Sequence, residues 1–215
     1  GCLALDPADA QHYLPWLQAQ KDAGKWIVVD VNLRPSVMPD LSKYRAHVLA
    51  MAKMADVLKA SDEDLAHLQL PGTTPMDQAM HLMQLGSAQW MALTLGADGA
   101  RLMVRQGDAL KTFNAKEAGP VKVVDTVGAG DSFLAGLLAC ALHHADAQPS
   151  PVNLKAWAQL ASASQLQDVL CHALASATLC ASSARVMHTG SGMARKTTAT
   201  PAAHVATTRP PLNTR

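Results

Sequence analysis

Hydrophobic positions along this chain fall into two alternating patterns, short continuous runs and longer stretches with helical spacing. Apolar, partly β-branched runs bounded by turn residues predict strands at 1–5, 26–31, 56–59, 90–95, 100–105, 111–114 and 121–125. Helical spacing and capping residues predict helices at 7–21, 41–54, from 61 onward, 76–86, 132–144, 153–164 and 165–184. Strands that alternate with helices of this length predict an α/β fold with a largely parallel sheet covered on both faces.

In such a sheet, ligands bind beyond the carboxyl ends of the strands. That rule directs attention to four predicted strand-to-loop junctions, at 30–34, 59–64, 94–99 and 125–131. The last 30 residues break the pattern, because they lack apolar periodicity and contain no acidic residue. We therefore expect 186–215 to be a disordered tail.

Composition narrows the classes of function. The 215 residues are 49% hydrophobic and 16% charged, and no uncharged apolar stretch is long enough for a membrane span. The net charge of +1 gives no reason to expect a nucleic-acid partner. All 17 acidic residues lie at or before Asp168, together with 13 basic residues, and five basic residues follow. The basic end makes only a thin patch for a nucleic acid.

The four cysteines are Cys2, Cys140, Cys171 and Cys180. They form no C-x-x-C pair and the last three stand in apolar helical runs, so we expect buried reduced thiols and a cytoplasmic protein. The start of the chain has neither a signal peptide pattern nor an initiating Met. The adjacent His143 and His144 cannot share a helix face, which argues against a metal site. Residues predicted to fill the core are Trp26, Trp90, Trp157, Met51, Met54, Met76, Met80 and Met83.

The segment 124–133, VDTVGAGDSF, follows a predicted strand and opens a predicted helix. Gly128, Ala129 and Gly130 let the backbone approach a ligand, and the free N–H groups at the helix start favour an anion such as phosphate. Asp131 would lie in the first helical turn beside that anion, where a carboxylate can accept the proton of an attacking hydroxyl. An ordinary capped helix after a glycine-rich turn is the alternative.

The string D-T-x-G-A-G-D-S-F resembles the second signature of the ribokinase-like (PfkB) family of sugar kinases, in its fructokinase-like branch. It is neither a Walker A loop nor a dinucleotide-binding fingerprint. The resemblance implies a three-layer α/β/α fold with a mostly parallel sheet, and transfer of phosphate from ATP, with Mg²⁺, to a sugar primary hydroxyl, most of all that of fructose. It implies that Asp131 is the general base and that the amides of Gly128, Ala129 and Gly130 form the anion hole.

Residues 30–34, DVNLR, resemble the family's D-x-N-x-R segment. In the branch that contains fructokinases and 2-keto-3-deoxygluconate kinases, this implies substrate contacts from Asn32 and Arg34 as well as from Asp131. An arginine can bind a phosphate or a carboxylate through two parallel hydrogen bonds. The alternative for Arg34 is a surface residue before a proline turn.

Residues 59–64, KASDED, resemble the family's K-x-N-x-x-E, with Ser61 in place of Asn and Asp64 in place of Glu. The resemblance implies that Lys59 and Ser61 bind the nucleotide and that Asp64 organises Mg²⁺, although the Asp64 side chain is one methylene shorter. The same residues fit a capping box in which Ser61 and Asp64 only begin a helix.

Residues 94–99, TLGADG, resemble the T-x-G-x-x-G segment that lies along the nucleotide in relatives. This implies nucleotide contacts from Thr94, Gly96 and Gly99, in addition to Gly128 and Gly130, and a plain β-turn is the alternative. Asp125 and Thr126 match the place where the family often holds a monovalent cation such as K⁺.

The resemblance covers residues 1–185, about the last two thirds of a family member, and leaves the first strands and the small β-lid without a counterpart. It implies that a full-length form dimerises through that lid. We expect the chain alone to be poorly stable, because its sheet would expose an edge and an apolar face. Alternative functions are 2-keto-3-deoxygluconate kinase or another ribokinase-like sugar kinase, and a non-catalytic nucleotide-binding fragment. The D-x-N-x-R and K-x-S-D-E strings favour these over a nucleoside kinase.

Overall fold

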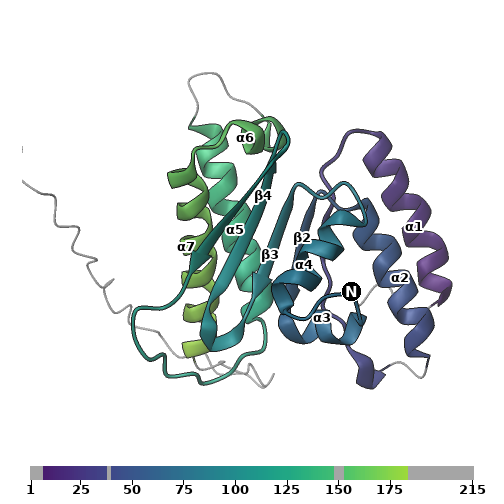
Figure 1. The fold of residues 1–215 in the computed structure, drawn as a ribbon, viewed down its shortest axis with the longest axis horizontal. Coiled ribbons are helices and arrows are strands. Elements are labelled where there is room, and N and C mark those ends of the chain that lie inside the picture. The colour runs from purple at the N-terminus through teal and green to yellow at the C-terminus, as the bar shows by residue number, and fades with distance from the viewer. Residues whose placement is uncertain (1–6, 38–39, 148–152, 184–215) are drawn as a thin grey trace, which may run out of the picture. The chain divides into compact units, whose positions relative to one another are not determined.

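The computed structural model describes residues 7–37, 40–147 and 153–183. Its helices are α1 (Pro7–Asp22), α2 (Leu41–Met54), α3 (Asp62–Leu68), α4 (Pro75–Gln84), α5 (Ala129–Asp146), α6 (Leu154–Leu160) and α7 (Ala163–Ser182). Its strands are β1 (Val28–Asp30), β2 (Val57–Ser61), β3 (Trp90–Thr94), β4 (Ala100–Gln106) and β5 (Ala109–Ala115) (Figure 1). Two 3₁₀ turns are η2 (Pro35–Val37) and η3 (Gly96–Asp98). The strand expected at 1–5 and the tail expected at 186–215 lie outside the described residues.

The strands form one sheet in the order β1-β2-β3-β4-β5. β1, β2 and β3 are parallel, with Val28 opposite Val57 and Val57 opposite Trp90. β4 pairs in antiparallel fashion with both β3 and β5, so four of the five strands run in one direction. The expectation of a mostly parallel sheet in an α/β fold is confirmed.

Helices cover both faces of this sheet (Figure 1). Consecutive residues of a strand point to opposite faces. Val57 and Trp90 pack into a buried cluster with residues of α5, α6 and α7. Leu58 and Met91 pack into a second cluster with residues of α2, α3 and α4. The structure therefore has three layers, and Lys59, two residues after Val57, lies on the α5 side.

Polar caps define where several helices begin. Ser61, Thr74 and Ser162 each open a helix with a reciprocal capping box, which satisfies amides that would otherwise lack acceptors. Asp40 accepts a hydrogen bond from the Lys43 amide and starts α2, whose limits match the predicted 41–54. The predicted capping role of Ser61 is thus confirmed.

The helices α5 and α7 approach each other closely at Gly136. A Cβ atom on Gly136 would lie 2.8 Å from Cβ of Ser176 and 3.3 Å from Cα of Ala173. Since real Cβ atoms almost never come within 3.0 Å of another heavy atom, the missing side chain is what allows this spacing.

The strand expected at 121–125 is wrong. Val123 and Val124 are each more than half exposed, and the amides of Val124 and Asp125 both donate to the Ala181 carbonyl at 2.8 and 3.1 Å. The β-branched residues gave a strand pattern, but the backbone bonds to the end of α7 instead of to a neighbouring strand.

Most of the expected core residues are inside. Trp90 and Trp157 are fully buried, Met51 and Met83 are buried, and Met76 and Met80 pack against the core from its edge. The expectation of buried thiols is wrong for Cys171, which is exposed on α7, while Cys140 and Cys180 are half-buried. Periodicity placed Cys171 in a helix, but its side chain is exposed on α7 and its sulfur accepts a hydrogen bond from Gln167.

Candidate active site

Three of the predicted nucleotide-binding residues lie at neighbouring strand ends. Ser61, the last residue of β2, pairs with Thr94, the last residue of β3. Lys59 pairs with Asp30 at the end of β1. The parallel register therefore brings the first three predicted junctions together at one edge of the sheet, as expected for an α/β ligand site.

A buried ion pair joins the first two junctions. The Lys59 ammonium donates to both carboxylate oxygens of Asp30, at 3.1 and 3.0 Å, and the two side chains are 6% and 16% exposed. Burial raises the pKa of Asp30 above its ordinary value of 3.8, against the lowering effect of Lys59. Sequence reasoning gave Asp30 no role, although a lysine inside a buried strand needs a counter-ion.

The glycine-rich loop approaches this pair from the α5 side of the sheet. A Cβ atom on Gly130 would lie 2.7 Å from the Lys59 ammonium nitrogen and 3.6 Å from its Cε. Gly130 is thus the position that lets the first turn of α5 come down onto Lys59. This contact brings the fourth predicted junction to the second one.

The start of α5 presents backbone donors. Gly128 is the N-cap with φ of 86°, a left-handed conformation that favours glycine, and the first intrahelical bond runs from the Ser132 amide to the Gly128 carbonyl. The amides of Gly130 and Asp131 precede that bond and so have no acceptor within the helix. Together with the helix dipole they form a site suited to an anion.

Two carboxylates flank this turn. Asp131 is exposed in the first turn of α5, as predicted. Asp125 accepts a hydrogen bond from the Val127 amide at 2.9 Å, and the Thr126 carbonyl accepts one from Ala129. Asp125 therefore shapes the loop, and its role toward a monovalent cation stays a prediction.

The loop after β1 carries the predicted substrate residues. Asn32 is half-buried with φ of 35°, and the buried residues on either side, Val31 and Leu33, are fixed by hydrogen bonds of their backbone amides. The Leu33 amide donates to Asp64, and the Arg34 amide donates to the Tyr44 hydroxyl at 3.2 Å. The Arg34 side chain is exposed, so it is available to a ligand beyond the strand ends.

Asp64 is buried and bridges two segments. Its Oδ2 accepts the Ser61 amide at 2.9 Å and completes the capping box, and its Oδ1 accepts the Leu33 amide at 2.7 Å. Both oxygens thus bond to backbone. Among the described residues, no three His, Cys, Asp or Glu side chains are placed to hold a metal ion. The Mg²⁺ role of Asp64 stays a prediction, because both of its oxygens already accept hydrogen bonds from backbone amides.

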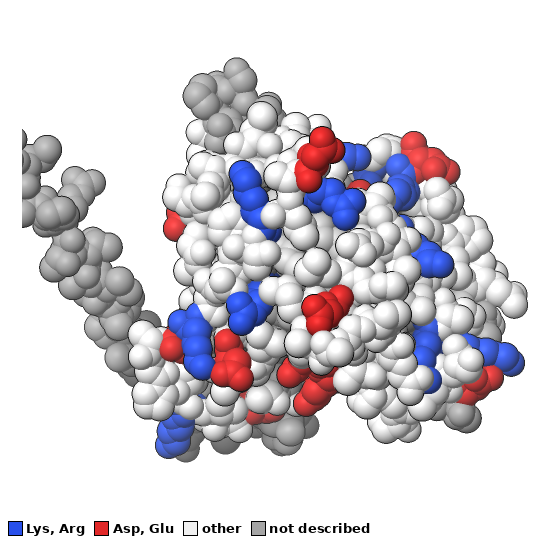
Figure 2. Space-filling model, viewed as in Figure 1, with Lys and Arg blue, Asp and Glu red and all other residues white. Residues whose placement is uncertain are grey.

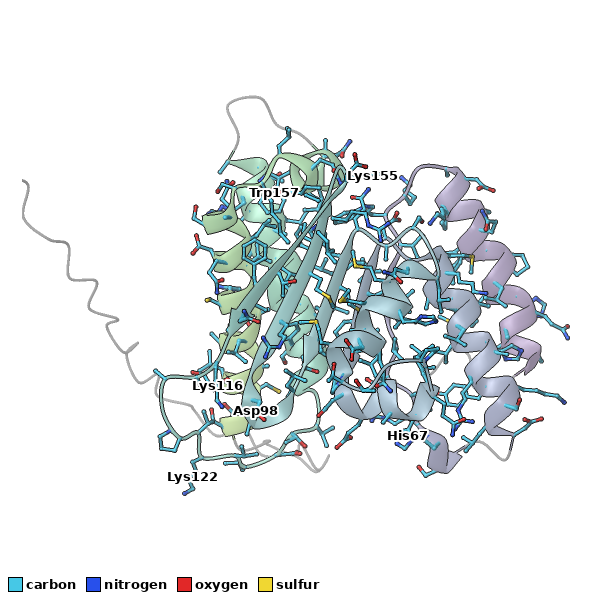
Figure 3. All side chains as sticks on the ribbon, viewed as in Figure 1. His67, Asp98, Lys116, Lys122, Lys155 and Trp157 are labelled. Atoms are coloured by element: carbon cyan, nitrogen blue, oxygen red, sulfur yellow. The ribbon has the colours of Figure 1, made fainter. Side chains whose placement is uncertain are left out.

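Residues 94–99 form a tight turn at the end of β3. The Leu95 amide donates to the Gly99 carbonyl, and Gly99 has φ of 87°. A Cβ atom on Gly99 would clash with the Ala115 carbonyl, so glycine lets this turn pack on β5. Asp98 also pairs with Lys116 at 2.8 Å, and Figure 3 shows both residues at the edge of the sheet opposite Trp157.

The end of α7 holds the segment before the glycine-rich loop, a feature that the sequence patterns did not indicate. The Ala181 carbonyl takes the amides of Val124 and Asp125. Thr178 donates to Glu117 at 2.6 Å, and the Cys180 thiol lies 3.9 Å from the Val127 carbonyl. These contacts join residues far apart in the chain, which no local spacing reveals.

Most of the sequence matches one family of enzymes. The model of the pfkB family of carbohydrate kinases matches residues 2–185. The chain belongs to this family. A fructokinase from Vibrio alginolyticus is 37% identical over 136 residues, which are 63% of this chain and 42% of that kinase. An aminoimidazole riboside kinase from Salmonella typhimurium is 33% identical over 118 residues, which are 55% of this chain and 35% of that kinase.

Solved structures of pfkB kinases share the fold. Aminoimidazole riboside kinase from Salmonella enterica, complexed with aminoimidazole riboside and an ATP analogue, gives a TM-score of 0.64 at 26% identity, over 85% of this chain and 55% of that one. Fructokinase with bound ATP from Xylella fastidiosa gives 0.66 at 23% identity, over 84% and 53%. The chain therefore spans about half the length of these kinases, and the three-layer α/β/α fold of the pfkB family is confirmed.

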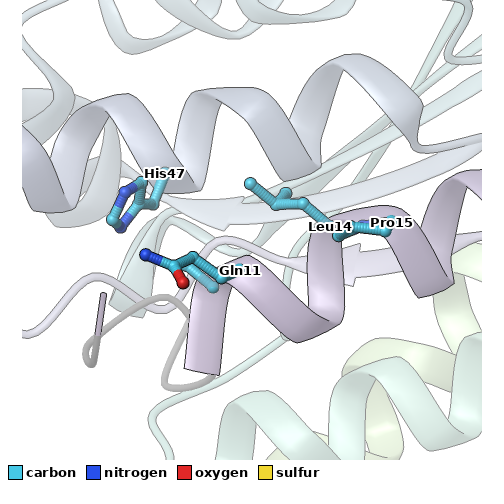
Figure 4. Close-up of a pocket in the computed structure, with 5 residues that line it drawn as sticks. Gln11, Leu14, Pro15 and His47 are labelled. Atoms are coloured by element: carbon cyan, nitrogen blue, oxygen red, sulfur yellow. The ribbon is translucent and has the colours of Figure 1, made fainter. Parts of the chain in front are cut away.

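One pocket of the described residues lies away from the strand ends. A shallow groove of about 340 Å³ lies between α1 and α2, but it is lined by Ala10, Gln11, Leu14, Pro15 and His47 and by none of the residues at the strand ends (Figure 4). Acidic and basic side chains are interspersed on the face drawn in Figure 2. Within the described ranges, no helix combines the length and apolarity that a bilayer crossing requires.

Proposed function

We propose that the chain forms the ATP-binding and phosphoryl-transfer part of a sugar kinase of the fructokinase type, with Asp131 as general base. The observation that carries the proposal is the first turn of α5, where two amides without intrahelical acceptors and an exposed carboxylate lie above the buried Lys59. The similarity to a fructokinase at 37% identity supports fructose as substrate.

In this proposal the phosphates of ATP bind at the start of α5, where the amides stabilise the charge that builds up on the transferring group. The primary hydroxyl oxygen of the sugar bonds to the γ-phosphorus while the bond to the oxygen of the leaving ADP breaks. Asp131 accepts the proton that the hydroxyl loses. Arg34 steadies the substrate or the transferring group, since its side chain is exposed beside the strand ends.

Three alternatives each have a specific observation behind them. The exposed Arg34 suits the carboxylate of 2-keto-3-deoxygluconate. The similarity to an aminoimidazole riboside kinase favours a nucleoside-type acceptor, which the sequence motifs disfavoured. A non-catalytic nucleotide-binding fragment is consistent with a chain that spans about half of its relatives. A cytoplasmic location and dimerisation of a full-length form through a lid remain predictions of the resemblance.

The test combines binding and turnover on the 215-residue chain. Calorimetry measures ATP binding, and a coupled assay measures ADP release with fructose, 2-keto-3-deoxygluconate or aminoimidazole riboside. Turnover with fructose first among these supports the proposal, and a different preferred acceptor names the alternative. Binding without turnover on any acceptor selects the non-catalytic fragment, and absence of ATP binding rejects all of these functions.

The role of Asp131 is tested by Asp131→Asn beside Asp146→Asn, an exposed aspartate at the other end of the same helix. Asp131→Asn should keep its affinity for ATP and lose turnover by about 10²–10⁴-fold, because a proton acceptor is lost. Asp146→Asn should change neither quantity. Retained turnover in Asp131→Asn would remove that residue from the role of base.

A further inference from the structure

Asp30 has no part in the proposed reaction, yet it is one of the best-positioned charges at the strand ends. Both of its oxygens accept from the Lys59 ammonium, and the direct β1–β2 register places the two residues side by side. The Val31 amide also donates to the Lys59 carbonyl at 2.9 Å, so the backbones are fixed to each other. Asp30 can therefore set the position of the Lys59 ammonium.

The location of that ammonium is unfavourable without an anion. It lies against the first turn of α5, at 2.7 Å from where a Cβ on Gly130 would be, and a helix N-terminus carries the positive end of the dipole. Cations are stabilised at the opposite end of a helix. A buried lysine in this place therefore needs negative charge beside it, and Asp30 supplies one such charge in the unliganded protein.

We propose that Asp30 is a positioning residue for the nucleotide: it holds the Lys59 ammonium under Gly130, where the ammonium reinforces the binding of phosphate at the start of α5. The proposal rests on the proposed function, because it requires phosphate to bind at that turn. The expected change in ATP affinity is opposite to the one that the charge of Asp30 alone predicts. Removing a negative charge near a phosphate should tighten binding by Coulomb's law alone, whereas loss of the Lys59 position weakens it.

A double-mutant cycle on ATP affinity tests this, using calorimetry on the 215-residue chain with Asp30→Asn, Lys59→Met and the double variant. Asp30 and Lys59 act through one contact, so each single change should weaken ATP binding by about tenfold and the double variant should be no weaker than Lys59→Met alone. Asp108→Asn, an identical charge change in the exposed β4–β5 turn, should leave the affinity unchanged.

If the ion pair had a purely structural role, a folded double variant would bind ATP as tightly as the wild type. The positioning role predicts otherwise. Replacing both members of a buried ion pair with uncharged residues is often neutral for stability, so the unliganded double variant should melt near the wild type while binding ATP weakly. If Asp30→Asn does not fold, the double variant still decides, since it leaves no buried charge unpaired. Wild-type affinity in the double variant overturns the proposal.

The remaining outcomes separate the two proposals. Equal or tighter ATP binding by Asp30→Asn, or additive effects in the cycle, overturns the positioning role while the proposed kinase function stands. No ATP binding by the wild-type chain overturns the proposed function and the positioning role with it. Weak binding confined to the three variants, with a wild-type response of Asp108→Asn, supports both.

Discussion

Replacing Asp64 with alanine should destabilise the whole candidate site, because this one carboxylate bonds to the loop after β1 and to the end of β2. Its Oδ1 accepts the Leu33 amide in a buried bond of 2.7 Å, and its Oδ2 accepts the Ser61 amide at 2.9 Å. Alanine removes both bonds and leaves the buried Leu33 amide without an acceptor. The loop that carries Arg34 would then lose its attachment to α3.

The magnitude follows from these two contacts. A hydrogen bond to a charged group contributes about 1.5–3 kcal/mol, and loss of a helix cap costs about 0.5–2 kcal/mol. Because the Ser61 bond is only partly buried, we expect Asp64→Ala to lower the free energy of unfolding by about 2–5 kcal/mol. Asp62→Ala is the matched control. It removes a half-buried charge from the same helical turn and should cost about 0.3–1 kcal/mol.

Urea unfolding followed by circular dichroism measures both variants. The loss in Asp64→Ala should be the same with and without Mg²⁺, because it comes from hydrogen bonds to backbone and not from a metal. The reasoning is refuted if Asp64→Ala loses no more than Asp62→Ala. A loss that exists only when Mg²⁺ is present would instead favour the metal role that the resemblance implies.

Three further predictions use other parts of the fold. Gly136→Ala should destabilise the protein by about 1–3 kcal/mol in the same unfolding assay, because its Cβ would overlap Ser176, whereas Gly119→Ala, at a glycine with open space around it and without a positive φ, should change stability little. Hydrogen bonds from Thr74 and Thr73 lower the pKa of Asp77 below 3.8. The stability that Asp77 contributes is therefore present above pH 3.8 and is lost as the pH falls through the lower pKa of the folded state. Thermal melts of Asp77→Asn should show a smaller loss of stability over that pH range than melts of the wild type. In the described sheet β1 pairs only with β2, so the 215-residue chain should self-associate as its concentration rises, and a concentration-independent monomer in sedimentation with a cooperative melt would contradict this.

The sequence patterns located the parts of the site better than their attachments. Hydrophobic periodicity and capping residues predicted the bounds of α2 as observed and the capping box at Ser61. Both features depend on residues that are close together in the chain. The rule for parallel sheets then brought Lys59, Ser61 and Thr94 to one edge. What it did not give was Asp30 as the partner of Lys59, because the rule places strand ends without saying which side chains meet.

The error at 121–125 has a physical origin. Valines at 121, 123 and 124 are as suitable for an exposed extended loop as for a strand, and only a neighbouring strand would distinguish the two. The neighbour here is the end of α7, where the Ala181 carbonyl accepts two amides of the segment. That acceptor lies far along the chain. Because it is a backbone carbonyl, the side chain at position 181 does not indicate the contact.

The contacts that assemble the site form a connected series, and this has a consequence for how the site fails. Asp64 ties the loop after β1 to α3, Lys59 ties β1 through Asp30 to the first turn of α5, and Ala181 ties the segment before that turn to α7. Each tie uses a different element, so a change in one loosens a ligand-facing loop while the sheet beneath it stays packed. Loss of affinity for ATP should therefore exceed loss of stability where a contact is removed without leaving a buried group unpaired, as in the Asp30→Asn, Lys59→Met double variant, and calorimetry should detect that change before a thermal melt does.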